Sequence, residues 1–300
     1  MRFLFIIFAI TLVGCGSTPY RDDYTKHVNI IREGYLDETD FKFNFVENPN
    51  VDLRGLYSQN DTANASPIMY QGVGGVAGLL VQIGTHSSLI QSQRNSKLAK
   101  DQEHANNQIL PLIDITTEVP LRDLIGEHSS QIVSLENVGT DTVNIKPIFF
   151  SNSDMTELSV KSIVWLPLEE RRNKRKQRFK YKNLIQVYSP KLKDLQSQQL
   201  TNGDSEFLLE VLSSLLKTTL YITKNELTGQ FSKVRKTAQT FIVEENSSKK
   251  VIRGSIVANK CGYQIIQDIH SWFIAYPTPE IVASLNNDFV SLCHDKSIIN

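Results

Sequence analysis

The chain has 300 residues, of which 40% are hydrophobic and 21% charged, so its composition is that of a folded globular protein and excludes a disordered chain. Its 32 basic and 32 acidic residues balance, which argues against a global field that would attract nucleic acid. The length suffices for one large domain or two small ones.

The first fifteen residues differ in composition from everything that follows. Arg2 supplies a positive charge, and an apolar run from Phe3 to Val13 is broken only by Thr11. A charged start, a short apolar stretch and small residues before a cleavage point are typical of a secretory signal peptide. The run is shorter than the roughly 20 residues that span a bilayer, which disfavours a permanent transmembrane anchor.

Four residues at the end of this segment resemble the lipobox of bacterial lipoproteins, namely Leu12, Val13, Gly14 and Cys15. The resemblance implies that residues 1–14 are removed and that Cys15 carries a diacylglyceryl group and an acylated amino terminus. Each buried methylene adds about 0.8 kcal/mol of membrane affinity, so several acyl chains anchor a protein without a spanning helix. Gly16, rather than Asp, follows the cysteine, which in this family favours the outer membrane facing the periplasm, with the cell surface as the alternative.

Two further cysteines, Cys261 and Cys293, remain in what would be an oxidising compartment. Such an even pair predicts a disulfide, and two buried free thiols are the alternative. The bond would close a loop of about 33 residues and stabilise the fold by about 3–4 kcal/mol. Cys293 and His294 are adjacent rather than spaced like paired zinc ligands, so no metal site is expected. Loss of Arg2 leaves 31 basic against 32 acidic residues, a net charge of −1.

Residues 15–66 are expected to form the lipidated N-terminus and a tether, with the tether itself over residues 16–23. Within this region a single strand is predicted, because aromatic side chains alternate with polar ones at Phe41, Phe43 and Phe45. Residues 58–66 are rich in Asn, Asp, Ser and Ala, which predicts a loop.

Residues 67–110 are predicted to be a Gly-rich and then polar helical segment. Gly74 and Gly78 are four residues apart, which on a helix places them on one face where another helix can approach closely. A tightly packed internal helix is the favoured interpretation, with self-association and membrane contact as alternatives. The polar helix, over residues 91–108, should stop before Pro111.

Residues 111–300 are predicted to form an α+β body: an antiparallel sheet with packed helices. Alternating patterns predict strands at 132–137, 143–149, 158–168 and 178–189, in an antiparallel meander with one buried face. A helix capped by Asp204 or Ser205 should lie against the sheet, because apolar residues recur at helical spacing from Leu208 to Leu216. Further strands are expected at 237–244, 251–258, 262–267 and 271–276, and a last helix begins at Thr278-Pro279.

The densest local charge is a basic run that follows Glu169 and Glu170 and comprises Arg171, Arg172, Lys174, Arg175, Lys176 and Arg178. Closely spaced cations bind phosphate groups, so this run is the predicted anion-binding site. The alternative is a solvated hairpin, with Lys180 and Lys182 on the outer face of a strand whose Phe179 and Tyr181 point inward.

Catalytic motifs are weak. Ser214 and Lys217 match the Ser-X-X-Lys motif of penicillin-binding proteins, but Ser247 and Lys250 match it too and the companion motifs are absent, which favours chance. The six histidines include no zinc-binding pair and no phosphate-binding Gly loop is present, so neither metal nor cofactor is expected. The aromatic residues Trp165, Trp272 and Tyr276 are interpreted as core rather than as a sugar platform.

These patterns together predict a non-catalytic envelope binding or assembly factor held on the membrane by its N-terminal lipid. Its expected partners are anionic lipid, lipopolysaccharide, a cell-wall polymer or an envelope protein, and not nucleic acid. One alternative is an envelope glycan or peptidoglycan hydrolase, whose carboxylates would carry no fixed spacing. Another is a self-assembling scaffold that uses the glycines between residues 72 and 84.

Overall fold

The structure is a computed structural model, which describes residues 30–31, 42–46, 48–57, 96, 99–126, 142–167, 179–234, 237–245, 248–260 and 262–278. The following predictions lie outside these residues: the signal peptide and Cys15, the tether, the loop at 58–66, the Gly-rich stretch, the strand at 132–137, the basic run from Arg171 to Arg178, Cys261 and Cys293, and the helix after Pro279.

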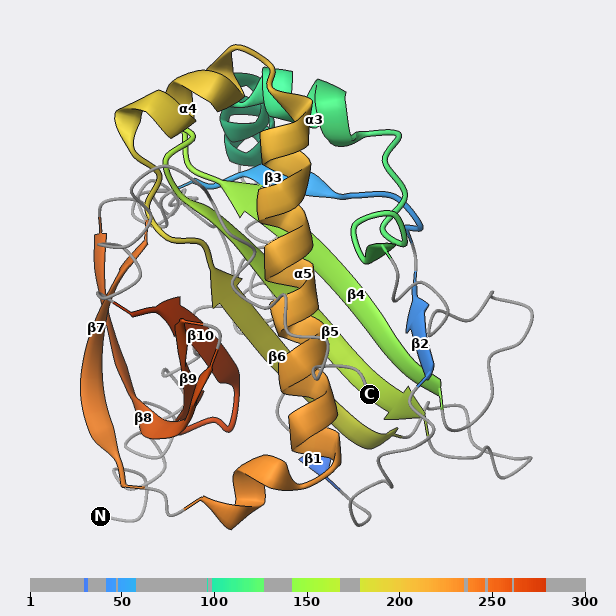
Figure 1. Ribbon diagram of the computed structural model, residues 1–300, viewed down its shortest axis with the longest axis vertical. Coiled ribbons are helices and arrows are strands. Elements are labelled where there is room, and N and C mark those ends of the chain that lie inside the picture. Colours follow the sequence, from blue (N-terminus) through green and yellow to red (C-terminus); the bar gives the residue numbers. More distant parts are fainter. Residues whose placement is uncertain are drawn as a thin grey trace, which may run out of the picture.

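One mixed sheet organises the described chain, with a long helix across one of its faces (Figure 1). The strand order is β2-β4-β5-β6-β10-β9-β8-β7, while β3 also pairs with β4 and β1 with β6. The strands are β1 (Ile30–Ile31), β2 (Lys42–Phe45), β3 (Leu53–Gly55), β4 (Thr142–Ser151), β5 (Leu158–Pro167), β6 (Phe179–Tyr188), β7 (Gln239–Glu245), β8 (Ser248–Lys260), β9 (Tyr263–Asp268) and β10 (Phe273–Pro277). The helices are α3 (Leu110–Thr116), α4 (Asp194–Thr201) and α5 (Ser205–Leu227), and a 3-10 turn covers Gln230–Lys233.

The predicted α+β class is confirmed, and so is the antiparallel meander, which is formed by β4, β5 and β6. The sheet as a whole is not antiparallel, however, because β2 and β3 run parallel to β4, and β10 runs parallel to β6. Each parallel pair is joined by a long stretch of chain that contains helices, as parallel strands require. Side-chain alternation reports which face a residue occupies and not the direction of its neighbour, so the sequence pattern did not reveal these pairs.

Helix α5 forms where the leucine spacing predicts it. The Asp204 carboxylate accepts a hydrogen bond from the Phe207 backbone N–H at 3.0 Å and so caps the first turn, and Glu206 lies in that same turn. The apolar side of the helix is buried against the meander, as its spacing predicts. The residues that carry this contact on the helix are Leu208, Val211, Leu212, Leu215 and Leu216, all fully buried.

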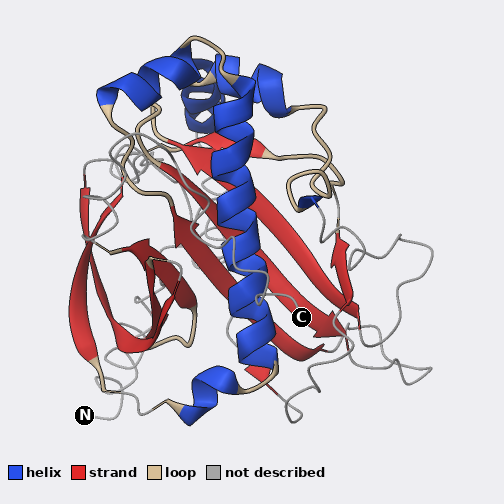
Figure 2. Cartoon of the chain, viewed as in Figure 1, coloured by secondary structure: helices blue, strands red, loops and turns tan. Residues whose placement is uncertain are grey.

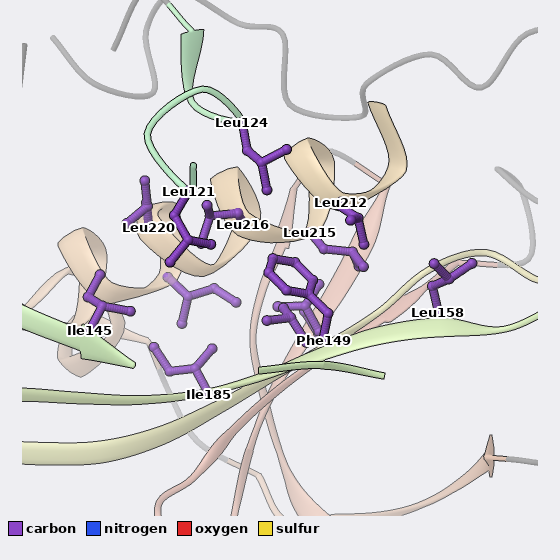
Figure 3. Packing of buried hydrophobic residues seen from close by; sticks show 14 of the residues in the cluster. Leu121, Leu124, Ile145, Phe149, Leu158, Ile185, Leu212, Leu215, Leu216 and Leu220 are labelled. Atoms are coloured by element: carbon purple, nitrogen blue, oxygen red, sulfur yellow. The ribbon is translucent and has the colours of Figure 1, made fainter. Parts of the chain in front are cut away.

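Helix α5 is covered on both sides. Figure 3 shows Ile145, Phe149 and Ile185 of the sheet below the helix and Leu121 and Leu124 above it. The Ser213 hydroxyl donates to the Leu124 carbonyl at 2.5 Å and ties that covering segment to the helix. The remaining helices gather at the N-terminal end of α5, so that helices occupy one side of the sheet (Figure 2). One continuous core therefore lies between the sheet and α5.

The segment before the meander supplies one end of the sheet. Phe43 and Phe45 are buried, as their alternation predicts, and β2 pairs with β4. A helix over residues 99–108 ends before Pro111, also as predicted, although α3 then begins at once with that proline in its first turn. The Asn106 side chain accepts a hydrogen bond from the Gly55 backbone N–H at 2.9 Å, which docks the helix on β3.

Candidate functional site

The face of the meander that points away from α5, here called the far face, is the surface that continues toward the basic run. The prediction of a single buried face is wrong at this point, because the far face carries a second apolar cluster formed by Ile148, Phe150, Ile163 and Leu184. Trp165 and Trp272 pack against this cluster and are half-buried. The strands of the meander are buried along nearly their whole length, so both faces contain core.

Three lysines of the meander lie on the far face, each half-buried: Lys146 on β4, Lys161 on β5 and Lys182 on β6. Every one of them is directly opposite an apolar residue of the neighbouring strand. The register pairs Lys146 with Ile163, Lys161 with Ile148, and Lys182 with Trp165. Their aliphatic stems therefore lie over apolar surface, an arrangement in which the ammonium groups stay at the rim.

The ammonium of Lys182 lies over an aromatic ring, 4.6 Å from the centre of the Phe179 side chain. Burial lowers the pKa of Lys182 from its ordinary value. Within the described part of the chain, no carboxylate lies at ion-pair distance from this ammonium. A partly desolvated cation beside an aromatic ring attracts anions more strongly than a fully solvated lysine does.

The position of Phe179 corrects one sequence prediction. Tyr181 points inward and is buried in the main core, as expected. The register shifts between Leu166 and Pro167, so that Leu166 pairs with Tyr181 but Pro167 pairs with Phe179. This irregularity places Phe179 on the same face as Lys182 rather than inward. Lys180 is the extra residue of the bulge, and a period of two along the strand did not foresee it.

A second lysine and ring meet farther along the far face. The ammonium of Lys161 lies 5.0 Å from the centre of the Phe150 ring. Two buried amide pairs border these contacts: Asn44 donates to Asn144 at 2.8 Å, and the Gln186 amide donates to the Tyr188 hydroxyl at 2.6 Å. The far face thus alternates cations, aromatic rings and amides, which are the groups that bind phosphate or carboxylate oligomers with exposed apolar surface.

Chain connectivity places the predicted anion-binding run next to this surface. Strand β5 ends at Pro167 and β6 begins at Phe179, so the run from Arg171 to Arg178 belongs to the segment that joins these two strand ends. The far-face residues nearest to those ends are Trp165, Phe179 and Lys182. Sequence reasoning identified the run and Lys182 but missed Lys146 and Lys161, which the alternation of lysine with buried residues in β4 and β5 was able to indicate.

The Ser-X-X-Lys match lies on the other side of the sheet. Ser214 is fully buried on α5, where substrate does not reach its hydroxyl. The hydroxyls of Ser214 and Tyr263 each lack a hydrogen-bond partner of ordinary geometry. Burial raises the pKa of Tyr263, and the nearby Ser214 hydroxyl counters that rise only in part. Ser214 is therefore a core residue of α5.

The hydrolase alternative directs attention to Asp268, whose pKa is raised by burial. Its carboxylate accepts hydrogen bonds from the backbone N–H groups of His270 and Trp272, each at 2.8 Å. The charged groups that act on it are His270 and Lys250, both of which lower the pKa. Asp268 thus stabilises the turn between β9 and β10. The third aromatic residue considered for sugar stacking, Tyr276, packs edge to face on Tyr188 with ring centres 5.6 Å apart.

Among the residues that the structure describes, no group of three or more His, Cys, Asp or Glu side chains is arranged to hold a metal ion. In the same part of the chain, no helix combines the length and apolar character needed to cross a membrane.

Comparisons with known proteins leave the functional argument to the residues themselves. No protein-family model matches the chain, and no curated protein or solved structure is significantly similar to it.

Proposed function

We propose that the protein is a lipid-anchored lipoprotein of the bacterial outer membrane that acts as a non-catalytic binding or assembly factor. Its acylated Cys15 would hold the chain on the membrane, and its ligand would be an anionic component of the envelope. The binding surface would consist of the run from Arg171 to Arg178 together with the lysines and aromatic rings of the far face. The observation that supports this most directly is the contact between Lys182 and Phe179 beside the strand ends that the run connects.

The chemistry of this surface fits an anion that also presents apolar groups. Guanidinium groups bind phosphate or carboxylate oxygens through two parallel hydrogen bonds, while lysines act as point charges. Trp165 and Phe179 supply flat apolar surface between the cations. Phospholipid, lipopolysaccharide and cell-wall polymers all carry such anionic groups, and the experiment below separates them.

The test replaces Arg171, Arg172, Lys174, Arg175 and Lys176 with Gln in the full chain. Binding is measured by co-sedimentation with three probes: vesicles of phosphatidylglycerol and phosphatidylcholine, lipopolysaccharide, and purified peptidoglycan. The wild type should bind at least one of them, with an affinity that falls as salt rises, and the variant should bind that probe more weakly and with a smaller salt dependence. Equal binding of the variant and the wild type to all three probes would contradict the proposal.

The anchor has its own test, so that the two parts of the proposal are separable. Cells that express the wild type or Cys15→Ser are labelled with radioactive palmitate and fractionated. The wild type should incorporate label and sediment with the outer membrane, while Cys15→Ser should do neither. A labelled Cys15→Ser protein that stays with the envelope would overturn the lipoprotein assignment and leave the anion-binding surface untouched.

A further inference from the structure

Strand β7 forms the last strand at one end of the sheet. It pairs with β8, and within the described part of the chain no strand lies beyond it (Figure 1). Half of the backbone N–H and C=O groups of an edge strand point away from the sheet and are available to another strand. Natural proteins usually protect such an edge with lysine, proline or a bulge.

The edge of β7 lacks these protections. Its first five residues, Gln-Thr-Phe-Ile-Val, carry no charge, and no proline occurs in the strand. The register along β7 and β8 runs without a shift. On one face of this hairpin Val243 and Ile252 are buried, whereas on the other face Ile242 and Val251 are 66% and 68% exposed. These two exposed residues lie directly opposite each other and form an apolar pair on the surface.

We propose that this edge binds a second copy of the same chain, with the two β7 strands antiparallel and Ile242 on the two-fold axis. A two-fold interface requires a surface that is complementary to itself. In this register each Ile242 lies opposite Ile242 of the second copy, so the pair Val251 and Ile242 continues into a four-residue apolar stripe across both hairpins. The ten-strand sheet of one molecule would thereby continue into the sheet of the other.

The charges around this stripe are complementary only in this arrangement. On the same face, Thr240 pairs with Arg253, and Glu244 pairs with Lys249. The two-fold axis at Ile242 sets Glu244 of one copy opposite Thr240 of the other, next to that copy's Arg253. Each glutamate then lies between basic residues of both chains, which is favourable. A register centred on Glu244 would instead oppose two glutamates. On the buried side, Phe241 would meet Val243 of the second copy.

Cysteine cross-linking tests the register in the full chain. Side chains directly opposite each other on antiparallel strands have Cβ atoms about 4.5–5.5 Å apart, so Ile242→Cys should form an intermolecular disulfide on mild oxidation. Val251→Cys is the matched control, since it is equally exposed on the same face. In the dimer its two copies would be three strand spacings apart, about 14 Å, which is too far for a disulfide. The wild type shows the background from the native cysteines.

The mass of the purified chain in detergent, measured by light scattering with the detergent subtracted, tests the dimer itself. The wild type should be a dimer, and Ile242→Lys, which opposes two ammonium groups on the axis, should be a monomer. Ile269→Lys alters an isoleucine that is also 66% exposed, on the turn between β9 and β10, and should remain a dimer. A monomeric wild type at about 100 μM would overturn the proposal. A dimer that survives Ile242→Lys, or equal cross-linking by Val251→Cys, would overturn it as well.

Discussion

The backbones of Gly55 and Ala105 approach each other so closely that a Cβ atom at Gly55 would overlap the Ala105 carbonyl. This contact seats the helix of residues 99–108 on β3, and the Gln102 side chain donates to the Gly55 carbonyl at 2.9 Å beside it. Only glycine fits, because the obstructing atoms belong to backbone rather than to a flexible side chain.

Gly55→Ala should therefore lower the free energy of unfolding by about 3 kcal/mol or more, since the helix must shift away from the strand. The control is Gly203→Ala. Gly203 has a positive φ of 81° but no atom within 4 Å of the added Cβ, so only the backbone conformation is penalised, by about 1–2 kcal/mol. Urea denaturation of both variants measures the difference. Equal losses would show that the close contact does not constrain the helix.

Two buried tyrosines differ in whether their hydroxyl groups are satisfied. The Tyr263 hydroxyl is fully buried without a hydrogen-bond partner, whereas the Tyr188 hydroxyl accepts a 2.6 Å bond from Gln186. Tyr263→Phe should leave the free energy of unfolding unchanged or raise it by up to about 1 kcal/mol, because an unpaired polar group leaves the core. Tyr188→Phe should lower it by about 1–2 kcal/mol, because the Gln186 amide loses its partner. A loss at Tyr263 as large as that at Tyr188, in thermal or urea unfolding, would contradict this.

The carboxylate of Asp268 is expected to contribute its hydrogen bonds but not its charge. Asp268→Asn keeps an oxygen for the two backbone N–H groups and removes a charge that burial disfavours, so it should match or exceed the wild type in stability at neutral pH. Asp268→Ala, which loses both bonds, should cost about 1–2 kcal/mol.

The pH dependence at this position has a definite sign. The folded-state pKa of Asp268 lies above its ordinary value of 3.8, so the folded state binds the proton more tightly than the unfolded state does. The wild type should therefore gain stability relative to Asp268→Asn as the pH falls through the folded pKa, and the gain should be complete below pH 3.8. Urea unfolding of both proteins from pH 7 to pH 3.5 measures it. A relative loss of stability on acidification would show that the carboxylate is stabilised as an anion.

The lowered pKa of Lys182 makes a prediction about ligand binding. Because burial lets this ammonium lose its proton at a lower pH than an ordinary lysine, binding of an anion should weaken as the pH becomes alkaline. Lys182→Arg, which stays charged, should keep its affinity over the same range. Co-sedimentation with the probe that the wild type binds, from pH 7 to pH 10, compares the two. Parallel pH profiles would mean that Lys182 does not contact the anion.

Sequence periodicity was sufficient for the elements whose pattern is local. The leucine spacing of α5, its Asp204 cap and the strands on either side of the basic run are present as predicted, because each depends on residues a few positions apart. The direction of β10 beside β6 depends on contacts nearly 90 residues apart, which no local pattern encodes. The bulge at Lys180 is a departure from the period of two, and it moves Phe179 to the far face.

The candidate site was predictable in the same uneven way. Charge density alone identified the run from Arg171 to Arg178. The lysines at 146 and 161 were passed over because each is isolated in sequence, and only the register of β4 and β5 with β6 brings them onto one surface with Lys182.

The account depends on the far face acting with the basic run, and three lysines test that dependence. The triple variant Lys146→Gln, Lys161→Gln and Lys182→Gln is compared with a control that loses the same charge across the sheet, at Lys217 and Lys224 of α5 and Lys233. The affinity for the anionic probe should fall on the order of 100-fold in the first variant, at about 1 kcal/mol for each cation, and little in the control. Equal losses in both variants would show that binding follows net charge alone and would contradict a site on the far face.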